Sequence, residues 1–76
     1  MKTFLRYESD TLEEAKPFAS KREAVEAFEA TARELIRFGQ KIEASLHIAA
    51  SIDELAEYPD FVLSLGPREG VRCEAA

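Results

Sequence analysis

The chemistry open to this 76-residue chain is limited by its few nucleophiles and metal ligands. It contains one cysteine, Cys73, and one histidine, His47. One thiol cannot form a disulfide within the chain, and one thiol with one imidazole is too few for the four ligands of a structural zinc site. Cys73 alternates with apolar neighbours on its predicted strand, whereas His47 falls on the polar side of its own. A Cys–His dyad would need opposite faces of one sheet to meet, so we predict no catalytic, metal-binding or cofactor-binding residue.

Segment 66–70 (GPREG) has a glycine at each end, but its pattern does not indicate a phosphate-binding loop. It lacks the GxxxxGK[ST] pattern and leads into a strand, so the helix-terminal amides that bind phosphate are missing. The composition favours a turn between the two strands of a hairpin. Arg68 at its tip is a candidate contact residue, because arginine is enriched at protein interfaces.

Carboxylates are the most numerous charged groups of the chain. Fifteen acidic and 10 basic residues give a formal net charge of −5. This balance argues against direct binding of nucleic acid, whose phosphates are held by clustered lysine and arginine. The same charge favours docking on a basic protein surface, including one that normally holds nucleic acid, and it also aids solubility. The candidate partner-binding residues are Glu26, Glu29, Glu34, Asp53, Glu54, Glu57, Arg68 and Arg72. Either the acidic helical face or the hairpin face could be the binding surface.

The clearest predicted element is an amphipathic helix that begins after Ser20. Ser20 and Glu23 have capping-box spacing, in which the serine hydroxyl accepts from the Glu23 amide and the glutamate reaches back to the Ser20 amide. Apolar residues then form one helical stripe at Val25, Phe28, Ala32, Leu35 and Ile36. Glu29 lies four residues before Arg33, which predicts a supporting ion pair. Gly39 is expected to end the helix.

The rest of the chain has the pattern of short strands. Residues 3–8 and 41–50 alternate apolar and polar side chains, which is typical of strands with one buried face. Residues 61–65 and 71–75 flank the turn at 66–70 and form a hairpin. A further short edge strand is expected around Phe18, because Pro17 disfavours a helix.

A second capping-box pattern begins at Ser51 and predicts a short second helix that Pro59 ends. On that helix, Ile52, Leu55 and Tyr58 would line up on one side.

These elements predict one α+β domain over residues 1–76, with a small antiparallel sheet and helices on one face in the order β-α-β-α-β-β. The expected core combines Ile42, Leu46, Ile48, Leu63 and Leu65 with Val25, Phe28, Leu35 and Ile36. The opposite face of the sheet would carry Arg6, Glu8, Lys41, Glu43, Ser45, His47, Arg72 and Glu74. That face is either solvated or an interface.

No apolar run approaches the roughly 18 residues that a membrane span needs. Charged side chains at Lys2 and Arg6 interrupt the apolar core that a signal peptide would require. We therefore expect a cytoplasmic protein that does not contact the membrane.

Residues 58–68 (YPDFVLSLGPR) and 32–40 (ARELIRFGQ) resemble segments of small uncharacterised accessory proteins of bacterial phages, plasmids and genomic islands. The resemblance includes no catalytic motif and assigns no functional residue. It implies a context in which small acidic proteins inhibit host defence. Anti-CRISPR proteins act in this way, mainly by stoichiometric binding to an effector complex and frequently at its nucleic-acid channel.

We therefore expect a non-enzymatic protein-binding module, an anti-CRISPR-like inhibitor that docks on a host defence complex and blocks nucleic-acid binding. The alternative is a structural or assembly protein that acts through homodimerisation, by the sheet face or an edge strand.

Overall fold

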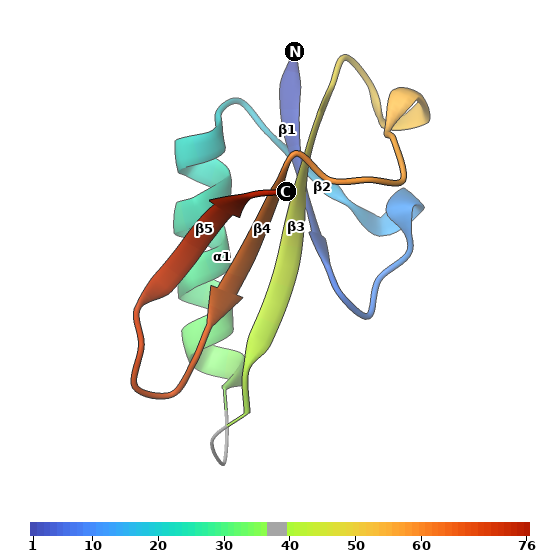
Figure 1. The fold of residues 1–76 in the computed structure, drawn as a ribbon. Coiled ribbons are helices and arrows are strands. Elements are labelled where there is room, and N and C mark those ends of the chain that lie inside the picture. The colour runs from blue at the N-terminus through green and yellow to red at the C-terminus, as the bar shows by residue number, and fades with distance from the viewer. Residues whose placement is uncertain (37–39) are drawn as a thin grey trace.

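A five-stranded antiparallel sheet with one α-helix against it forms the fold in the computed structural model, which describes residues 1–36 and 40–76 (Figure 1). The strands are β1 (Lys2–Tyr7), β2 (Lys16–Phe18), β3 (Ile42–Ala49), β4 (Phe61–Leu65) and β5 (Val71–Ala75), and the helix is α1 (Lys21–Leu35). The spatial order of the strands is β2-β1-β3-β4-β5. The predicted α+β class, the antiparallel sheet, the hairpin and the edge strand around Phe18 are confirmed.

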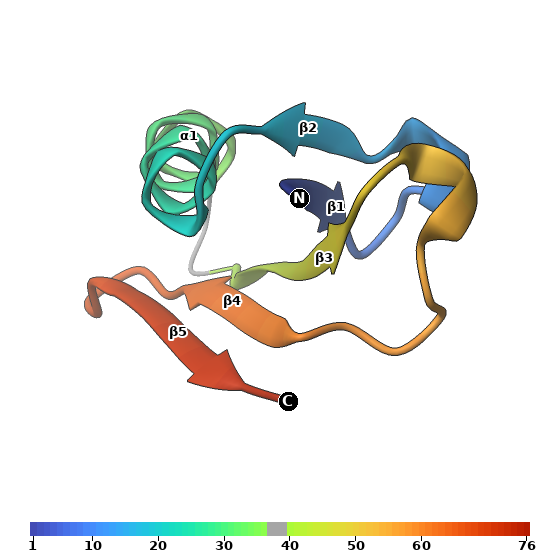
Figure 2. The same ribbon diagram turned by 90° about the horizontal axis from the view of Figure 1, so that it is seen from above.

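The second predicted helix is reduced to a single 3₁₀ turn, Ile52–Glu54, and the Ser51 side chain makes no capping hydrogen bond. A similar 3₁₀ turn, Leu12–Glu14, precedes β2. Figure 2 shows the sheet between α1 on one side and the segments that carry both turns on the other. Among the described residues, no helix is long and apolar enough to cross a membrane.

The start of α1 follows the capping pattern with one difference. The Glu23 amide donates to Ser20 Oγ at 3.2 Å, as predicted. The Glu23 carboxylate accepts from the Ala19 amide at 3.2 Å instead of from the Ser20 amide. The helix end predicted at Gly39 lies outside the described residues, and α1 is assigned as far as Leu35.

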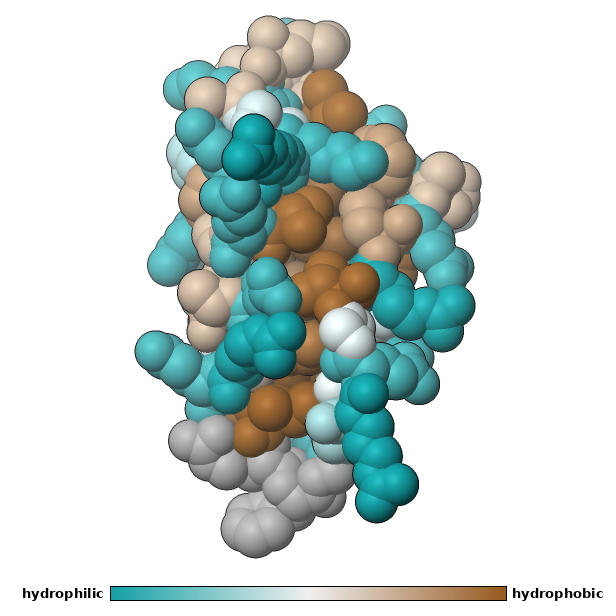
Figure 3. Space-filling model, turned by 90° about the vertical axis from the view of Figure 1, so that its left-hand side faces the viewer, coloured by the Kyte–Doolittle hydropathy of each residue, from teal (hydrophilic) through white to brown (hydrophobic). Residues whose placement is uncertain are grey.

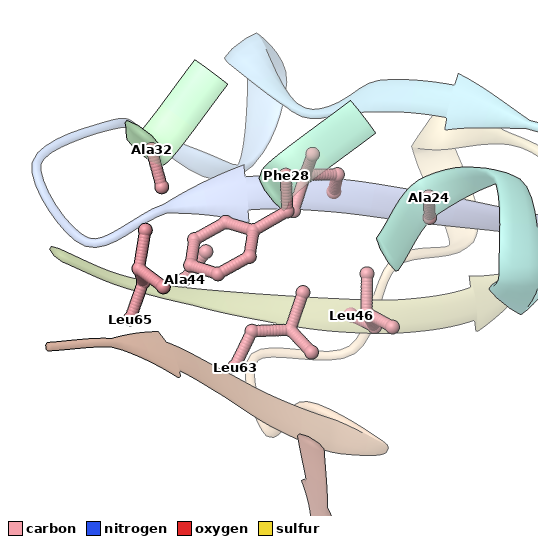
Figure 4. Packing of buried hydrophobic residues seen from close by; sticks show 8 residues of the cluster. Ala24, Phe28, Ala32, Ala44, Leu46, Leu63 and Leu65 are labelled. Carbon is pink, nitrogen blue, oxygen red and sulfur yellow. The ribbon is translucent and has the colours of Figure 1, made fainter. Parts of the chain in front are cut away.

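The main core lies between α1 and the sheet (Figure 4). Phe28 is its largest side chain, and its ring points from the helix toward Leu63 and Leu65. Ala24 and Ala32 lie one turn on either side and are fully buried, because their small side chains let the helix approach the sheet closely. The buried members of the cluster are Leu5, Ala24, Phe28, Ala32, Ala44, Leu46, Leu63 and Leu65.

The predicted burial is wrong for two core residues, and both lie near the ends of their elements. Leu35 is 54% exposed in the last turn of α1, where it lines a hollow together with Tyr7 and Ile42. Ile48 is 41% exposed near the opposite end of the sheet, where it pairs with Thr3. Periodicity identifies the buried face of an element but not how far along the element the packing against its neighbours extends. The other predicted members with partial burial, Val25, Ile36 and Ile42, pack against the cluster.

A second, smaller cluster covers part of the other face of the sheet. Phe4, Ala15 and Ala49 are buried there, and Leu55 packs against them. The prediction that Ser45 and His47 lie on a wet face is therefore wrong, since the loops covering this half of the face bury both. The remaining predicted residues of this face, Arg6, Glu8, Lys41, Glu43, Arg72 and Glu74, are half-buried or exposed.

Candidate functional site

Cys73 and His47 lie on opposite faces of the sheet, as their strand phases predict. Cys73 pairs with Leu63 and packs against the main core on the helix side. His47 pairs with Phe4, which belongs to the smaller cluster on the other side. The two side chains are not placed to act together. Within residues 1–36 and 40–76, no three His, Cys, Asp or Glu side chains are grouped to hold a metal ion.

His47 is buried beneath the segment that joins β3 to β4, residues 50–60, which we call the acidic loop. Its Nδ1 lies 2.9 Å from the carbonyl oxygen of Ala56 in this loop, and its Nε2 lies 2.9 Å from Ser45 Oγ. A carbonyl oxygen only accepts, so Nδ1 carries the proton, and the neutral ring accepts from the Ser45 hydroxyl at Nε2. His47 thus connects the middle of the acidic loop to β3.

Asp60 fixes the end of the acidic loop. Its Oδ2 accepts from the Ile48 amide at 2.7 Å, and its own amide donates to the Leu46 carbonyl at 2.8 Å. Its carbonyl accepts from the Ala76 amide at 3.1 Å. Together with Leu55 in the smaller cluster, these bonds hold the loop in one position on the sheet. A loop held in this way loses little conformational entropy when it binds a partner.

The acidic loop presents carboxylates and apolar side chains to solvent. It contains four acidic residues and no lysine or arginine. Asp53, Glu54 and Glu57 are exposed, and their carboxylates form no hydrogen bond or ion pair within the described part of the chain. Tyr58 is 85% exposed and Ile52 is 40% exposed. Tyrosine is enriched among the residues that dominate binding energy at interfaces.

The acidic residues of α1 are partly neutralised by their neighbours. Glu26 Oε1 lies 3.2 Å from Arg22 Nε, and Glu29 Oε2 lies 2.7 Å from Arg33 Nη2, which confirms the predicted Glu29–Arg33 pair. Glu34 is exposed and has no ion pair among the described residues. The helix therefore offers less uncompensated negative charge than the acidic loop does.

The two candidate arginines lie far from the acidic loop along the sheet. Arg68 is exposed in the turn after β4, whereas the acidic loop precedes β4. Arg72 contacts Glu74 at 3.2 Å and Glu69 at 4.0 Å. The structure thus does not join these arginines with the loop carboxylates into one site.

Sequence reasoning missed the exposure of Tyr58, because it placed Ile52, Leu55 and Tyr58 on one side of a helix. In the observed 3₁₀ turn and the residues after it, only Leu55 turns toward the sheet, while the other two face solvent. It also missed the two anchors of the loop. A helical pattern interrupted by proline within nine residues was the available signal that this segment would be a loop.

Folding stability should depend on the ionisation of His47. Burial lowers the pKa of its imidazole, with a smaller lowering effect from Arg6, although the hydrogen bond to Ala56 and the charge of Asp60 oppose this. As pH falls, the imidazole of His47 therefore becomes protonated at a higher pH in the unfolded chain than in the folded protein. The stability contributed by the neutral buried ring is lost as pH falls below the ordinary histidine pKa of about 6.5. We expect the free energy of unfolding in denaturant to fall more between about pH 7.5 and about pH 5.5 in the wild type than in His47→Gln. Equal falls in the two proteins would contradict this assignment.

No protein-family model matches this chain, and no curated protein or solved structure matches it.

Proposed function

We propose that this protein is a non-enzymatic protein-binding module whose acidic loop docks on a basic surface of another protein. The observation that carries the proposal is the set of exposed, unpaired carboxylates of Asp53, Glu54 and Glu57 on a loop held to the sheet by His47 and Asp60. Fixed charges of one sign steer association with a surface of the opposite sign. Exposed Tyr58 supplies an aromatic contact beside these charges.

The partner that we propose is a nucleic-acid-binding complex of host defence, as expected for an anti-CRISPR-like inhibitor. Such a complex holds a phosphate backbone in a basic channel. A compact acidic surface that occupies this channel excludes the nucleic acid without any chemical step. The net charge of −5 supports this mode of binding.

The test uses purified CRISPR effector complexes and fluorescently labelled target DNA. The wild-type protein should lower DNA binding, and this inhibition should weaken as salt rises, because exposed charges are screened over about 8–10 Å at ordinary ionic strength. Asp53→Lys with Glu57→Lys should weaken inhibition at least about tenfold, since attraction to a basic surface becomes repulsion.

A matched control is Glu26→Lys with Glu29→Lys on α1. This variant undergoes the same change in net charge at residues already paired with arginine. It should keep most of the inhibition. If instead the helix variant lost inhibition and the loop variant kept it, the binding surface would lie on α1. Absence of inhibition by the wild type across the panel of complexes would refute the proposed partner class.

A second candidate function, assembly through homodimerisation, is favoured by the position of β5 at one end of the strand order, where β4 is its one neighbour among the described strands.

A further inference from the structure

The two edges of the sheet differ in how well they are protected from pairing. The edge strand β2 has three residues and contains Lys16 and Pro17. The Glu8 amide donates to the Glu43 carbonyl at 3.2 Å, which continues the β1–β3 register. Because backbone groups alternate between the two sides of a strand, Phe4 directs its backbone groups toward β3 and away from β2. Its partner Pro17 therefore lies where a backbone N–H would face the open edge. Proline has no N–H, and proline and lysine are common means of blocking an edge strand.

Strand β5 has no such protection. The Ala76 amide donates to the Asp60 carbonyl at 3.1 Å and continues the β4–β5 register. By alternation, Arg72 and Glu74 direct their backbone groups toward β4. The residues whose N–H and C=O groups face the free edge are therefore Val71, Cys73 and Ala75. β5 has five residues, two more than β2, and it contains neither proline nor lysine.

We propose that β5 pairs antiparallel with β5 of a second copy of this chain, about a two-fold axis through Cys73. The pairing joins two five-stranded sheets into one continuous sheet with both helices on the same face. Each outward N–H and C=O of one strand then meets its counterpart on the other strand. This surface is separate from the acidic loop and does not depend on the function proposed for it.

The charges on β5 select this register. With the axis at Cys73, Arg72 of each copy lies opposite Glu74 of the other, and all five residues of the strand are paired. A shift of the axis by one residue would place Arg72 opposite Arg72, or Glu74 opposite Glu74, and like charges directly opposite each other are unfavourable. Within one chain, Arg72 Nη2 already lies 3.2 Å from Glu74 Oε1. The same side chains can therefore exchange partners across the axis.

The apolar surface beside β5 also fits a second copy. Phe61, Val71 and Cys73 are only partly buried where they pack against the main core. Figure 3 shows an apolar strip, flanked by hydrophilic side chains, on the side of the molecule that carries α1 and β5. Lys21 Nζ lies 4.1 Å from the centre of the Phe61 ring and covers part of this strip. In the proposed dimer, Cys73 lies opposite Cys73 and Val71 opposite Ala75 of the other copy, so the strip extends across the axis.

The test is sedimentation velocity of the full chain over a series of concentrations. The wild type should form dimers. Arg72→Glu and Glu74→Arg, each alone, should raise the dimer dissociation constant at least about tenfold, because each places like charges across the axis. An equal mixture of the two variants should form heterodimers, and the double variant R72E/E74R should dimerise like the wild type. Circular dichroism checks that each variant is folded.

Three results would overturn the proposal: a wild type that stays monomeric throughout the series, single variants that dimerise as well as the wild type, or a mixture that does not restore the dimer. The acidic-loop variant Asp53→Lys with Glu57→Lys should dimerise normally. Its behaviour separates failure of this interface from failure of the proposed function.

Discussion

Replacing Leu46 by alanine should lower the free energy of unfolding by about 2–5 kcal/mol. The Leu46 side chain is fully buried in the middle of β3, between α1 and the sheet. Its removal forfeits the burial of the side chain and leaves a cavity that close-packed neighbours fill only in part. The loss is a large fraction of the total stability of so small a domain. Denaturant unfolding followed by circular dichroism measures it.

Leu35→Ala is the matched control, because it removes the same atoms from a residue that the helical pattern also assigns to the core. Leu35 is 54% exposed, so we expect a loss below about 1 kcal/mol. A loss at Leu35 equal to that at Leu46 would mean that the last turn of α1 packs against the sheet more closely than the structure shows.

The strands and the helix could be predicted from the sequence because their local signals agree with their packing. Strict alternation along β3 and the capping pattern at Ser20 each describe an element that the structure contains. The alternation along β3 correctly predicts the burial of Leu46, which belongs to the same core cluster as the buried residues of α1. Ile48 has the same phase but lies beyond that cover, so no local pattern distinguishes it from Leu46.

The candidate site could be predicted only in part. The acidic residues after Ser51 stand out by their charge, and the structure shows that three of them, Asp53, Glu54 and Glu57, are exposed. Their positions depend on a loop that folds back over β3, and such contacts are long-range and leave no periodic signal in the sequence. The burial of His47 follows from the same fold-back, which is why a polar residue on the apparent wet face of a strand became a structural anchor.

Replacing His47 by alanine should both destabilise the protein and release the acidic loop. The Ala56 carbonyl loses a partner 2.9 Å away, and the Ser45 hydroxyl loses His47 Nε2 at 2.9 Å and keeps only the Arg6 carbonyl at 3.4 Å. Each lost hydrogen bond contributes about 0.5–1.5 kcal/mol to stability. The loop then keeps the bonds of Asp60 and the packing of Leu55 but loses its central attachment. We expect lower stability in denaturant and faster amide hydrogen exchange across residues 52–57, even under conditions in which the variant remains folded.

Ser45→Ala separates the two effects, because it removes the hydroxyl on Nε2 and leaves the bond between Nδ1 and Ala56 in place. This variant should lose about 0.5–1.5 kcal/mol, the usual contribution of one hydrogen bond, while exchange in the loop stays as in the wild type. If the loop is the binding surface, His47→Ala should also weaken partner binding more than Ser45→Ala does, since a mobile loop must be ordered on association. Unchanged loop exchange in folded His47→Ala would show that Asp60 and Leu55 alone hold the loop, and that His47 serves only to fill the space beneath it.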